Sequence, residues 1–196
     1  PEAAGPARFD PTWARHWRAQ HFIDALKECN AKLIADIGCG AVYPIIFALA
    51  GFDVHAVDIS NEAIDQVIKL ARKWNVESQI WCHVEPAENL PWATAQFDAV
   101  VQGEIWEHVP EPQKVVNEGL RVLKPGGYLI ATTPAGGHHF DPFHRGPVEG
   151  GWSEETLREL LKPWEGMVKR LEKIAEEGTE PSCFFVVLEK PLNSAV

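Results

Sequence analysis

The feature of the chain that most constrains its fold is a short apolar run that ends in an acid and two glycines. It reads Leu33-Ile34-Ala35-Asp36-Ile37-Gly38-Cys39-Gly40-Ala41. Such a run is too short for a free-standing helix, and it suits a buried parallel strand that turns tightly into a helix. Because Gly38 and Gly40 lack a Cβ atom, backbone N–H groups of this turn can approach a bound ligand closely. We therefore expect a ligand site where this strand ends.

Strands and helices are expected to alternate after this loop. Apolar runs bounded by turn residues predict strands, and apolar residues at i, i+3, i+4 and i+7 predict helices. The expected strands are residues 33–37, 54–58, 79–84, 97–102 and 128–133, and the helices are residues 43–50, 60–75 and 110–123. The Lys-Pro-Gly-Gly sequence at residues 124–127 predicts a turn. This alternation indicates an α/β fold with a doubly wound parallel sheet and right-handed crossovers.

A further helix is expected near the start of the chain. Asp10 followed by Pro11 is typical of a helix N-terminus, and we expect the helix to span residues 10–29. Trp13 and Trp17 are one helical turn apart and could form part of a lid over the site, although packing against the domain also explains them.

The alternation ends after the fifth strand. Residues 134–152 are rich in glycine, proline and histidine. This segment is too long for a simple connection, so we expect an acceptor-binding loop. A short helix should begin at Ser153, and residues 167–175 and 182–188 can pair as two final strands.

Length and composition limit the class of protein. A chain of 196 residues fits one domain, with one sizeable core. No apolar segment approaches the roughly 20 residues that cross a bilayer, and no signal peptide is evident. The net charge of −10 argues against sequence-independent binding to nucleic acid. The 4 cysteines show no paired metal or redox spacing, so we expect reduced thiols and a cytoplasmic location.

Three residues narrow the type of ligand at the glycine loop. A dinucleotide fingerprint needs a third glycine at position 43, where this chain has Tyr43. Asp36 puts a carboxylate beside the loop, which disfavours a pyrophosphate and suits a cationic group. Asp58, at the end of the second strand, could accept hydrogen bonds from a ribose diol. A cofactor that carries an adenosine, an ammonium and a sulfonium meets both demands.

On these residues the chain resembles the class I S-adenosylmethionine-dependent methyltransferases. The similar segments are residues 36–40 and 57–60, residues 87–92 with the strand at 97–101, and residues 121–128. They occur in the family's order within residues 30–133. The resemblance implies a Rossmann-like sheet of seven strands, mostly parallel, with an antiparallel addition at one edge.

The resemblance also implies which residues bind S-adenosyl-L-methionine. The glycines would approach its methionine part, Asp58 would hold the ribose and Ala87 with Glu88 would lie beside the adenine. The full candidate set is Asp36, Gly38, Gly40, Asp58, Ile59, Ala87, Glu88 and Gln102. The chain departs from the family at Val42, where a glycine is usual, and at Pro86, where many members have an aspartate.

A cluster of polar residues after the fourth strand could carry the chemistry. If the backbone is helical there, Glu104, Glu107 and His108 share one face. Their spacing resembles the Glu-x-x-Glu-His of ubiquinone-pathway O-methyltransferases and of small-RNA 3′-terminal 2′-O-methyltransferases. Carboxylate and imidazole ligands suit Mg²⁺ or another divalent cation, with His139 as a candidate fourth ligand among the loop histidines. Such an ion could lower the pKa of a substrate hydroxyl.

Two other interpretations of this cluster remain open. His108, with Glu107, could be a catalytic base without a metal, or it could have only a structural role. Because a sulfonium is a good leaving group, the proton of the nucleophile is the remaining difficulty, and an alcohol needs a base or metal more than an amine does.

The sequence therefore predicts an O-methyltransferase for a small hydroxylated acceptor, either a sugar or a phenolic or quinol compound. The alternatives are a metal-independent methyltransferase acting on nitrogen, carbon or oxygen, and a non-catalytic protein that binds the cofactor. Neither a membrane-associating insertion nor a basic surface for RNA is evident. The oligomeric state is not predicted.

Overall fold

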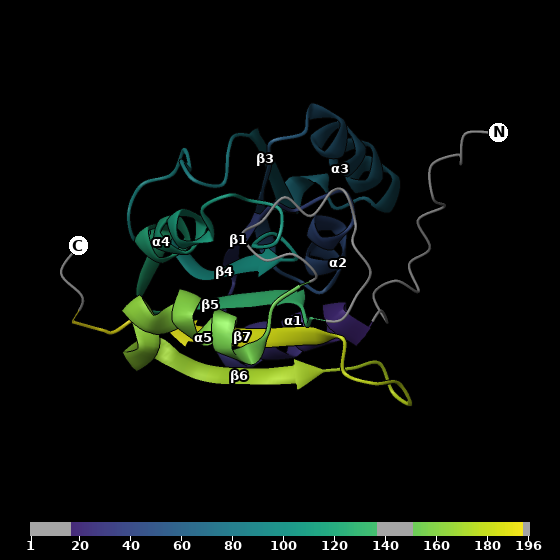
Figure 1. Ribbon diagram of the computed structural model, residues 1–196. Coiled ribbons are helices and arrows are strands. Elements are labelled where there is room, and N and C mark those ends of the chain that lie inside the picture. The colour runs from purple at the N-terminus through teal and green to yellow at the C-terminus, as the bar shows by residue number, and fades with distance from the viewer. Residues whose placement is uncertain (1–16, 137–150, 194–196) are drawn as a thin grey trace.

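A seven-stranded sheet runs through the computed structural model, which describes residues 17–136 and 151–193 (Figure 1). The strands lie in the order β3-β2-β1-β4-β5-β7-β6. Their bounds are β1 Leu33–Ile37, β2 Asp53–Asp58, β3 Ile80–Val84, β4 Phe97–Gly103, β5 Leu123–Pro134, β6 Val168–Ile174 and β7 Cys183–Glu189. The expectations for Asp10, Trp13 and the loop histidines lie outside the described residues.

The pairing of the strands confirms the predicted α/β sheet. The first five strands pair in parallel, and β7 runs antiparallel to both β5 and β6. The helices are α1 Trp17–Glu28, α2 Tyr43–Leu49, α3 Asn61–Trp74, α4 Pro112–Val122 and α5 Glu154–Leu161, with 3₁₀ turns at Glu77–Gln79 and Lys162–Met167. Because parallel strands need crossover connections, α2, α3 and α4 each lie between two successive parallel strands along the chain.

The helices cover both faces of the sheet (Figure 1). Buried residues of α1, α2 and α3 form one hydrophobic cluster with the sheet, and those of α4 and α5 form a second cluster. This arrangement buries the sheet between two layers, which explains why its central strands read as nearly continuous apolar runs. Within residues 17–136 and 151–193, no helix is long and apolar enough to cross a membrane.

Helix α3 illustrates how local sequence signals set an element. The Ser60 hydroxyl accepts a hydrogen bond from the Ala63 amide at 3.2 Å, which caps the start of the helix. Asn75 adopts a left-handed conformation, with φ of 57°, and ends it. Ile64, Val67 and Ala71 form its buried face, as the helical spacing predicts.

The expected turn at residues 124–127 is instead part of β5. Phe97 pairs with Leu123 and Ala99 pairs with Tyr128, so the intervening residues bulge out of register. Gly126 has a φ of +77°, which favours glycine. The turn residues therefore form a β-bulge inside one continuous strand, and the expected separate turn before the strand is not present.

Candidate active site

A cavity of about 710 Å³ lies at the carboxyl ends of the central parallel strands. It is lined by Gly38 after β1, residues 57–60 at the end of β2, and the segments after β3 and β4, which contribute Glu85, Ala87, Glu88, Glu104, Ile105 and residues 108–110. This is where doubly wound sheets bind ligands, because loops from adjacent strands converge there. The cavity brings together seven of the predicted site residues, which are Gly38, Asp58, Ile59, Ala87, Glu88, Glu104 and His108.

The glycine loop is held against β2 by its own amides. The N–H groups of Gly38 and Cys39 both donate to the Val57 carbonyl, at 2.9 and 3.1 Å. The Gly40 N–H donates to Oδ2 of Asp58 at 2.9 Å. The amides of Gly38, Cys39 and Gly40 are therefore bound within the chain, and the predicted approach of this loop to a ligand stays a prediction. A pyrophosphate would need such donors, so the loop does not provide the anion site of a dinucleotide fold.

The two glycines are required for different reasons. Both have positive φ, +67° at Gly38 and +56° at Gly40. A Cβ atom on Gly38 would overlap the Ile105 side chain, whereas a Cβ on Gly40 would meet no atom within 4 Å. Gly38 therefore allows the segment after β4 to pack on the loop, and Gly40 is needed chiefly for its backbone conformation.

Asp58 joins the glycine loop to the start of α3. In addition to the Gly40 amide, its Oδ1 accepts a hydrogen bond from the Ser60 amide at 2.9 Å. The residue also lines the cavity. Each carboxylate oxygen can accept more than one hydrogen bond, so Asp58 is oriented by the backbone and can still accept from a ligand diol.

Asp36 is a buried carboxyl behind the loop. It is only 1% exposed, and its Oδ2 has no hydrogen-bond partner in the structure. Burial raises the pKa of Asp36 well above its ordinary value, and the nearby charge of Asp58 is a second, smaller cause. A buried acid without a partner is costly, and a nearby cation would relieve that cost. Asp36 does not line the cavity, but this orphan oxygen fits a ligand with a cationic group.

Gln102 is a structural residue. It is fully buried, its amide Nε2 donates to the Val115 carbonyl at 2.8 Å, and its Oε1 accepts from the Trp106 indole at 2.8 Å. Both ends of the side chain therefore bind other parts of the protein, and the side chain does not reach the cavity. The prediction that Gln102 contacts a cofactor relied only on its position at the end of β4, and the side-chain bonds do not support it.

The segment that follows β4 is a series of turns and not a helix, so the condition for a shared helical face is not met. Glu104 has a positive φ of 53°, which is uncommon for a residue with a side chain. Its amide donates to the Thr132 carbonyl, and the His108 amide donates to the Ile105 carbonyl. Glu104, Glu107 and His108 therefore do not share a helical face.

Glu107 is buried beside the cavity. The Thr133 hydroxyl donates to its Oε2 at 2.9 Å, while its Oε1 has no hydrogen bond and lies 3.9 Å from Nε2 of His108. Burial, followed by the charge of Glu104, raises the pKa of Glu107 to about 8. The His108 side chain is 43% exposed and lines the cavity. A buried acid thus stands behind an accessible imidazole.

Glu104 forms contacts that the sequence did not reveal. Its Oε2 lies 3.8 Å from Nη1 of Arg18, in the first turn of α1, and its Oε1 accepts a hydrogen bond from the Cys183 thiol at 3.0 Å. The Nε of Arg18 is buried without a hydrogen-bond partner. A single arginine in a helix carries no motif, so sequence reasoning offered no signal for it.

The predicted metal ligands do not converge on one point. Across residues 17–136 and 151–193, no group of three or more His, Cys, Asp or Glu side chains could hold a metal ion. Glu107 is bound by Thr133, and Glu104 contacts Arg18 and Cys183. His139 lies outside the described residues. The described side chains therefore do not fit a preformed cation site, and we derive no reaction step through a cation.

The fold and the cavity together define the class of protein. Residues 35–131 match the family described as "Methyltransferase domain". The strand order, the single antiparallel strand and the position of the cavity are those of a Rossmann-like methyltransferase. The chain belongs to the class I S-adenosylmethionine-dependent methyltransferases, and it is an enzyme of that class.

Comparison with individual proteins adds detail. The chain is 28% identical to a ubiquinone biosynthesis O-methyltransferase of Xanthomonas oryzae pv. oryzae (strain PXO99A), over 83% of this chain and 80% of that protein. A SAM-dependent methyltransferase of Methanosarcina mazei is 23% identical, with a TM-score of 0.66 over 82% of this chain and 93% of that one. The [4+2]-cyclase SpnF has a TM-score of 0.73 at 17% identity, over 95% and 86% of the two chains. The structural likenesses show the fold alone.

Proposed function

We propose that this protein is an O-methyltransferase for a small hydroxylated acceptor, such as a phenol, quinol or sugar. The observation that carries the proposal is the buried Glu107 behind His108, whose imidazole lines the cavity. An alcohol or phenol must lose a proton when it accepts a methyl group, and a positioned imidazole can take it. The Xanthomonas relative is named as an O-methyltransferase, which supports the same reaction type.

The proposed donor site is the part of the cavity near the glycine loop. S-adenosyl-L-methionine supplies a methyl group on a positively charged sulfur and carries an ammonium and a carboxylate. The orphan oxygen of Asp36 suits the ammonium, Asp58 suits the ribose, and Ile59, Ala87 and Glu88 would border the adenosine. Arg18, whose buried Nε has no partner, is a candidate for the carboxylate.

His108 is the proposed catalytic base, and Glu107, once it is ionised, is proposed to stabilise the positive charge that forms on the imidazole. Glu107 carries a proton near neutral pH because its pKa is raised to about 8. Above that pH it becomes an anion 3.9 Å from the imidazole, where it would stabilise the protonated ring. The main work of the remaining site is to align the acceptor oxygen with the donor methyl group.

A small acceptor is favoured over nucleic acid. The net charge is −10, and the cavity wall carries Asp58, Glu85, Glu88 and Glu104. Such a surface would repel a phosphate backbone at short range.

Two finer hypotheses accompany the proposal. Assistance by a divalent cation is favoured only by the presence of Glu104 and His108 on the same cavity wall. Transfer to nitrogen or carbon without a metal would also use this cavity. In that case His108→Ala should reduce turnover more than Glu104→Ala.

The test combines binding and turnover. Calorimetry with S-adenosylhomocysteine measures the donor site without any acceptor. Incubation with S-adenosylmethionine and matched panels of catechols, phenols, amines and sugars then measures formation of S-adenosylhomocysteine. Methylation of hydroxyl compounds supports the proposal, and turnover confined to amines contradicts it. Binding without turnover on any acceptor would favour a protein that only binds the cofactor.

A further inference from the structure

The loop between β3 and β4 forms one wall of the cavity but has no regular secondary structure over residues 85–92. Glu85, Ala87 and Glu88 line the cavity. A wall made from such a loop needs hydrogen bonds from elsewhere to hold its position, because most of its backbone groups are not paired within a strand or helix. Helix α4 supplies the bonds at the end of the loop nearer β4.

We propose that Arg121 and Glu118 are positioning residues for the methyl donor, because they hold the adenine-side loop in place from a helix that lies behind it. This inference rests on the proposed donor site. Neither residue is among those that line the cavity. Their effect on the donor would therefore pass entirely through the backbone of the loop.

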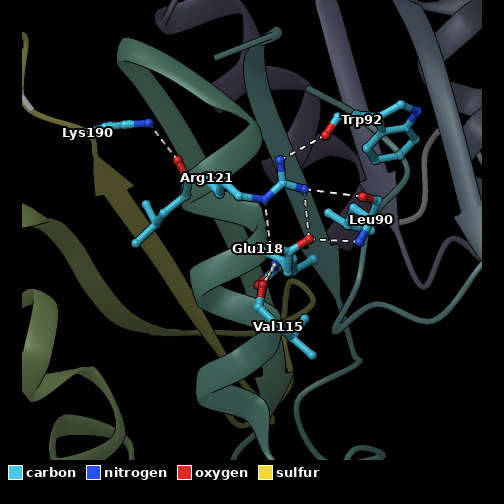
Figure 2. A network of polar contacts seen from close by, with 8 residues as sticks. Leu90, Trp92, Val115, Glu118, Arg121 and Lys190 are labelled. Carbon is cyan, nitrogen blue, oxygen red and sulfur yellow. Dashed lines mark hydrogen bonds and ion pairs between the residues drawn. The ribbon is translucent and has the colours of Figure 1, made fainter. Parts of the chain in front are cut away.

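The contacts form one network, shown in Figure 2. The Nη1 group of Arg121 donates to the Trp92 carbonyl at 2.8 Å, and its Nη2 group donates to the Leu90 carbonyl at 3.2 Å. Glu118 accepts a hydrogen bond from the Leu90 amide at 2.7 Å. Three backbone groups of the loop are thus bound by two side chains that come from one face of α4.

The two side chains also fix each other. The Nε and Nη2 groups of Arg121 donate to Oε1 and Oε2 of Glu118, at 2.7 and 2.8 Å. This two-point pairing sets the orientation of the guanidinium, and it leaves one edge of the group for the two loop carbonyls. A lysine has a single ammonium and cannot reproduce these four directions. Lysine is therefore not expected to replace arginine at this position.

The Arg121–Glu118 pair binds the loop at Leu90 and Trp92, which is the end of the loop nearer β4. The Leu90 and Trp92 side chains are buried, at 5% and 7% exposure. The other end is tied by the Glu85 amide, which donates to the Asp58 carbonyl at 3.2 Å. Ala87 and Glu88 lie between these two anchors, so releasing one anchor would let this part of the cavity wall move.

The expected effect is on donor affinity and not on the chemical step. In Arg121→Gln we expect the dissociation constant of S-adenosylhomocysteine and the KM for S-adenosylmethionine to rise about tenfold, as for the loss of one or two charge-assisted hydrogen bonds. Because the acceptor side of the cavity is unchanged, kcat at saturating donor should stay within about twofold of the wild type. Arg121→Lys should behave like Arg121→Gln, and Glu118→Gln should show a smaller rise.

The control is Arg158→Gln. Arg158 pairs with Glu154 within α5 at 2.8 Å, so the variant also removes an ion pair inside a helix, but one that binds no loop. Its donor affinity should equal that of the wild type. Hydrogen exchange of the Leu90 amide in the free enzyme gives a second readout, and it should be faster in both Arg121 variants.

Several outcomes would overturn the inference. One is a fall in the unfolding temperature of Arg121→Gln with an unchanged donor KM, because the pair would then stabilise only the fold. Another is an equal loss of affinity in Arg158→Gln. If the Arg121 variants fail to fold, Glu118→Gln decides the matter by the same comparison. A wild-type protein that does not bind S-adenosylhomocysteine would instead refute the proposed function on which the inference rests.

Discussion

The Oε1 atom of Glu107 lies 3.9 Å from Nε2 of His108, at the boundary between the protein interior and the cavity. The acid is 5% exposed, whereas the imidazole side chain is 43% exposed. Oε1 has no hydrogen bond, so the acid gains little from being ionised. Its burial therefore has consequences for both the stability and the pH dependence of the protein.

Glu107→Gln should make the protein more stable than the wild type at alkaline pH. The pKa of Glu107 rises from an ordinary value of 4.5 to about 8 in the folded state. Its contribution to stability is therefore fully present below pH 4.5 and is lost as the pH rises to about 8. Over that window the wild type should lose at most about 1.4 kcal/mol per pH unit from this group. Glutamine keeps an oxygen acceptor for Thr133 and does not titrate.

Urea unfolding at pH 5, 7 and 9 measures this effect. The difference in the free energy of unfolding between Glu107→Gln and the wild type should move in favour of the variant as the pH rises. Glu104→Gln is the control, because Glu104 is more exposed and contacts Arg18. A difference that is constant across the pH range would contradict the raised pKa.

Replacing His108 by asparagine should reduce kcat for a hydroxyl acceptor by about 10²- to 10⁴-fold, the usual contribution of a general base. Because His108 is not among the residues proposed to hold the donor, calorimetric affinity for S-adenosylhomocysteine should change little. The same substitution should have a smaller effect on a phenol of low pKa, which loses its proton readily without help. Equal loss with acidic and weakly acidic phenols would argue against a proton-transfer role.

Much of this architecture was predictable because it depends on local signals. Ser60 and Asn75 mark the ends of α3, and the apolar run before Asp36 forms β1 as expected. The site was less predictable because its side chains are paired through space. Arg18 meets Glu104 although they are far apart in the chain, and nothing in either local sequence indicates that pairing.

The conformation after β4 could not be read from the local sequence for a related reason. The spacing of Glu104 and His108 fits a helix, but the Glu104 amide binds Thr132 of the neighbouring strand. That tertiary hydrogen bond, with the positive φ of Glu104, overrides the local preference. For Gln102, the position at the end of β4 is visible in the sequence, whereas the bonds of its side chain to Val115 and Trp106 are not.

Removal of divalent cations should leave turnover unchanged. The two carboxylates of the candidate metal set are bound to protein groups, since Glu107 accepts from Thr133 and Glu104 contacts Arg18. Activity is measured after dialysis against EDTA and again after addition of Mg²⁺ or Mn²⁺. Loss of activity that returns with either ion would restore the cation hypothesis. His139→Ala would then test whether that residue is the missing ligand.

Asp58→Ala should weaken donor binding by at least about tenfold, since a carboxylate that accepts hydrogen bonds contributes more than a neutral group. The substitution also removes the acceptor for the Gly40 and Ser60 amides, so a decrease in stability should accompany it. Asp58→Asn keeps one oxygen acceptor and should lie between alanine and the wild type. Asp53→Asn, an exposed position on the same strand, is the control. Unaltered donor affinity in Asp58→Ala would contradict the proposed donor site.

Lys190→Met should lower the free energy of unfolding by about 1–3 kcal/mol, because it leaves buried carbonyl groups without a donor. Lys190 is 8% exposed, and its ammonium donates to the carbonyls of Leu120 and Leu123 at 2.8 Å each. Leu120 is in the last turn of α4 and Leu123 is the first residue of β5, on either side of Arg121 in the sequence. Chemical denaturation measures the loss, with Lys162→Met on exposed surface as the control. The effect on donor binding should be different. Because the Lys190 ammonium binds the junction of α4 and β5 and not the adenine-side loop, the donor KM of Lys190→Met should remain that of the wild type. A raised KM would mean that the whole C-terminal end of α4, and not the Arg121–Glu118 pair alone, sets the position of the adenine-side loop.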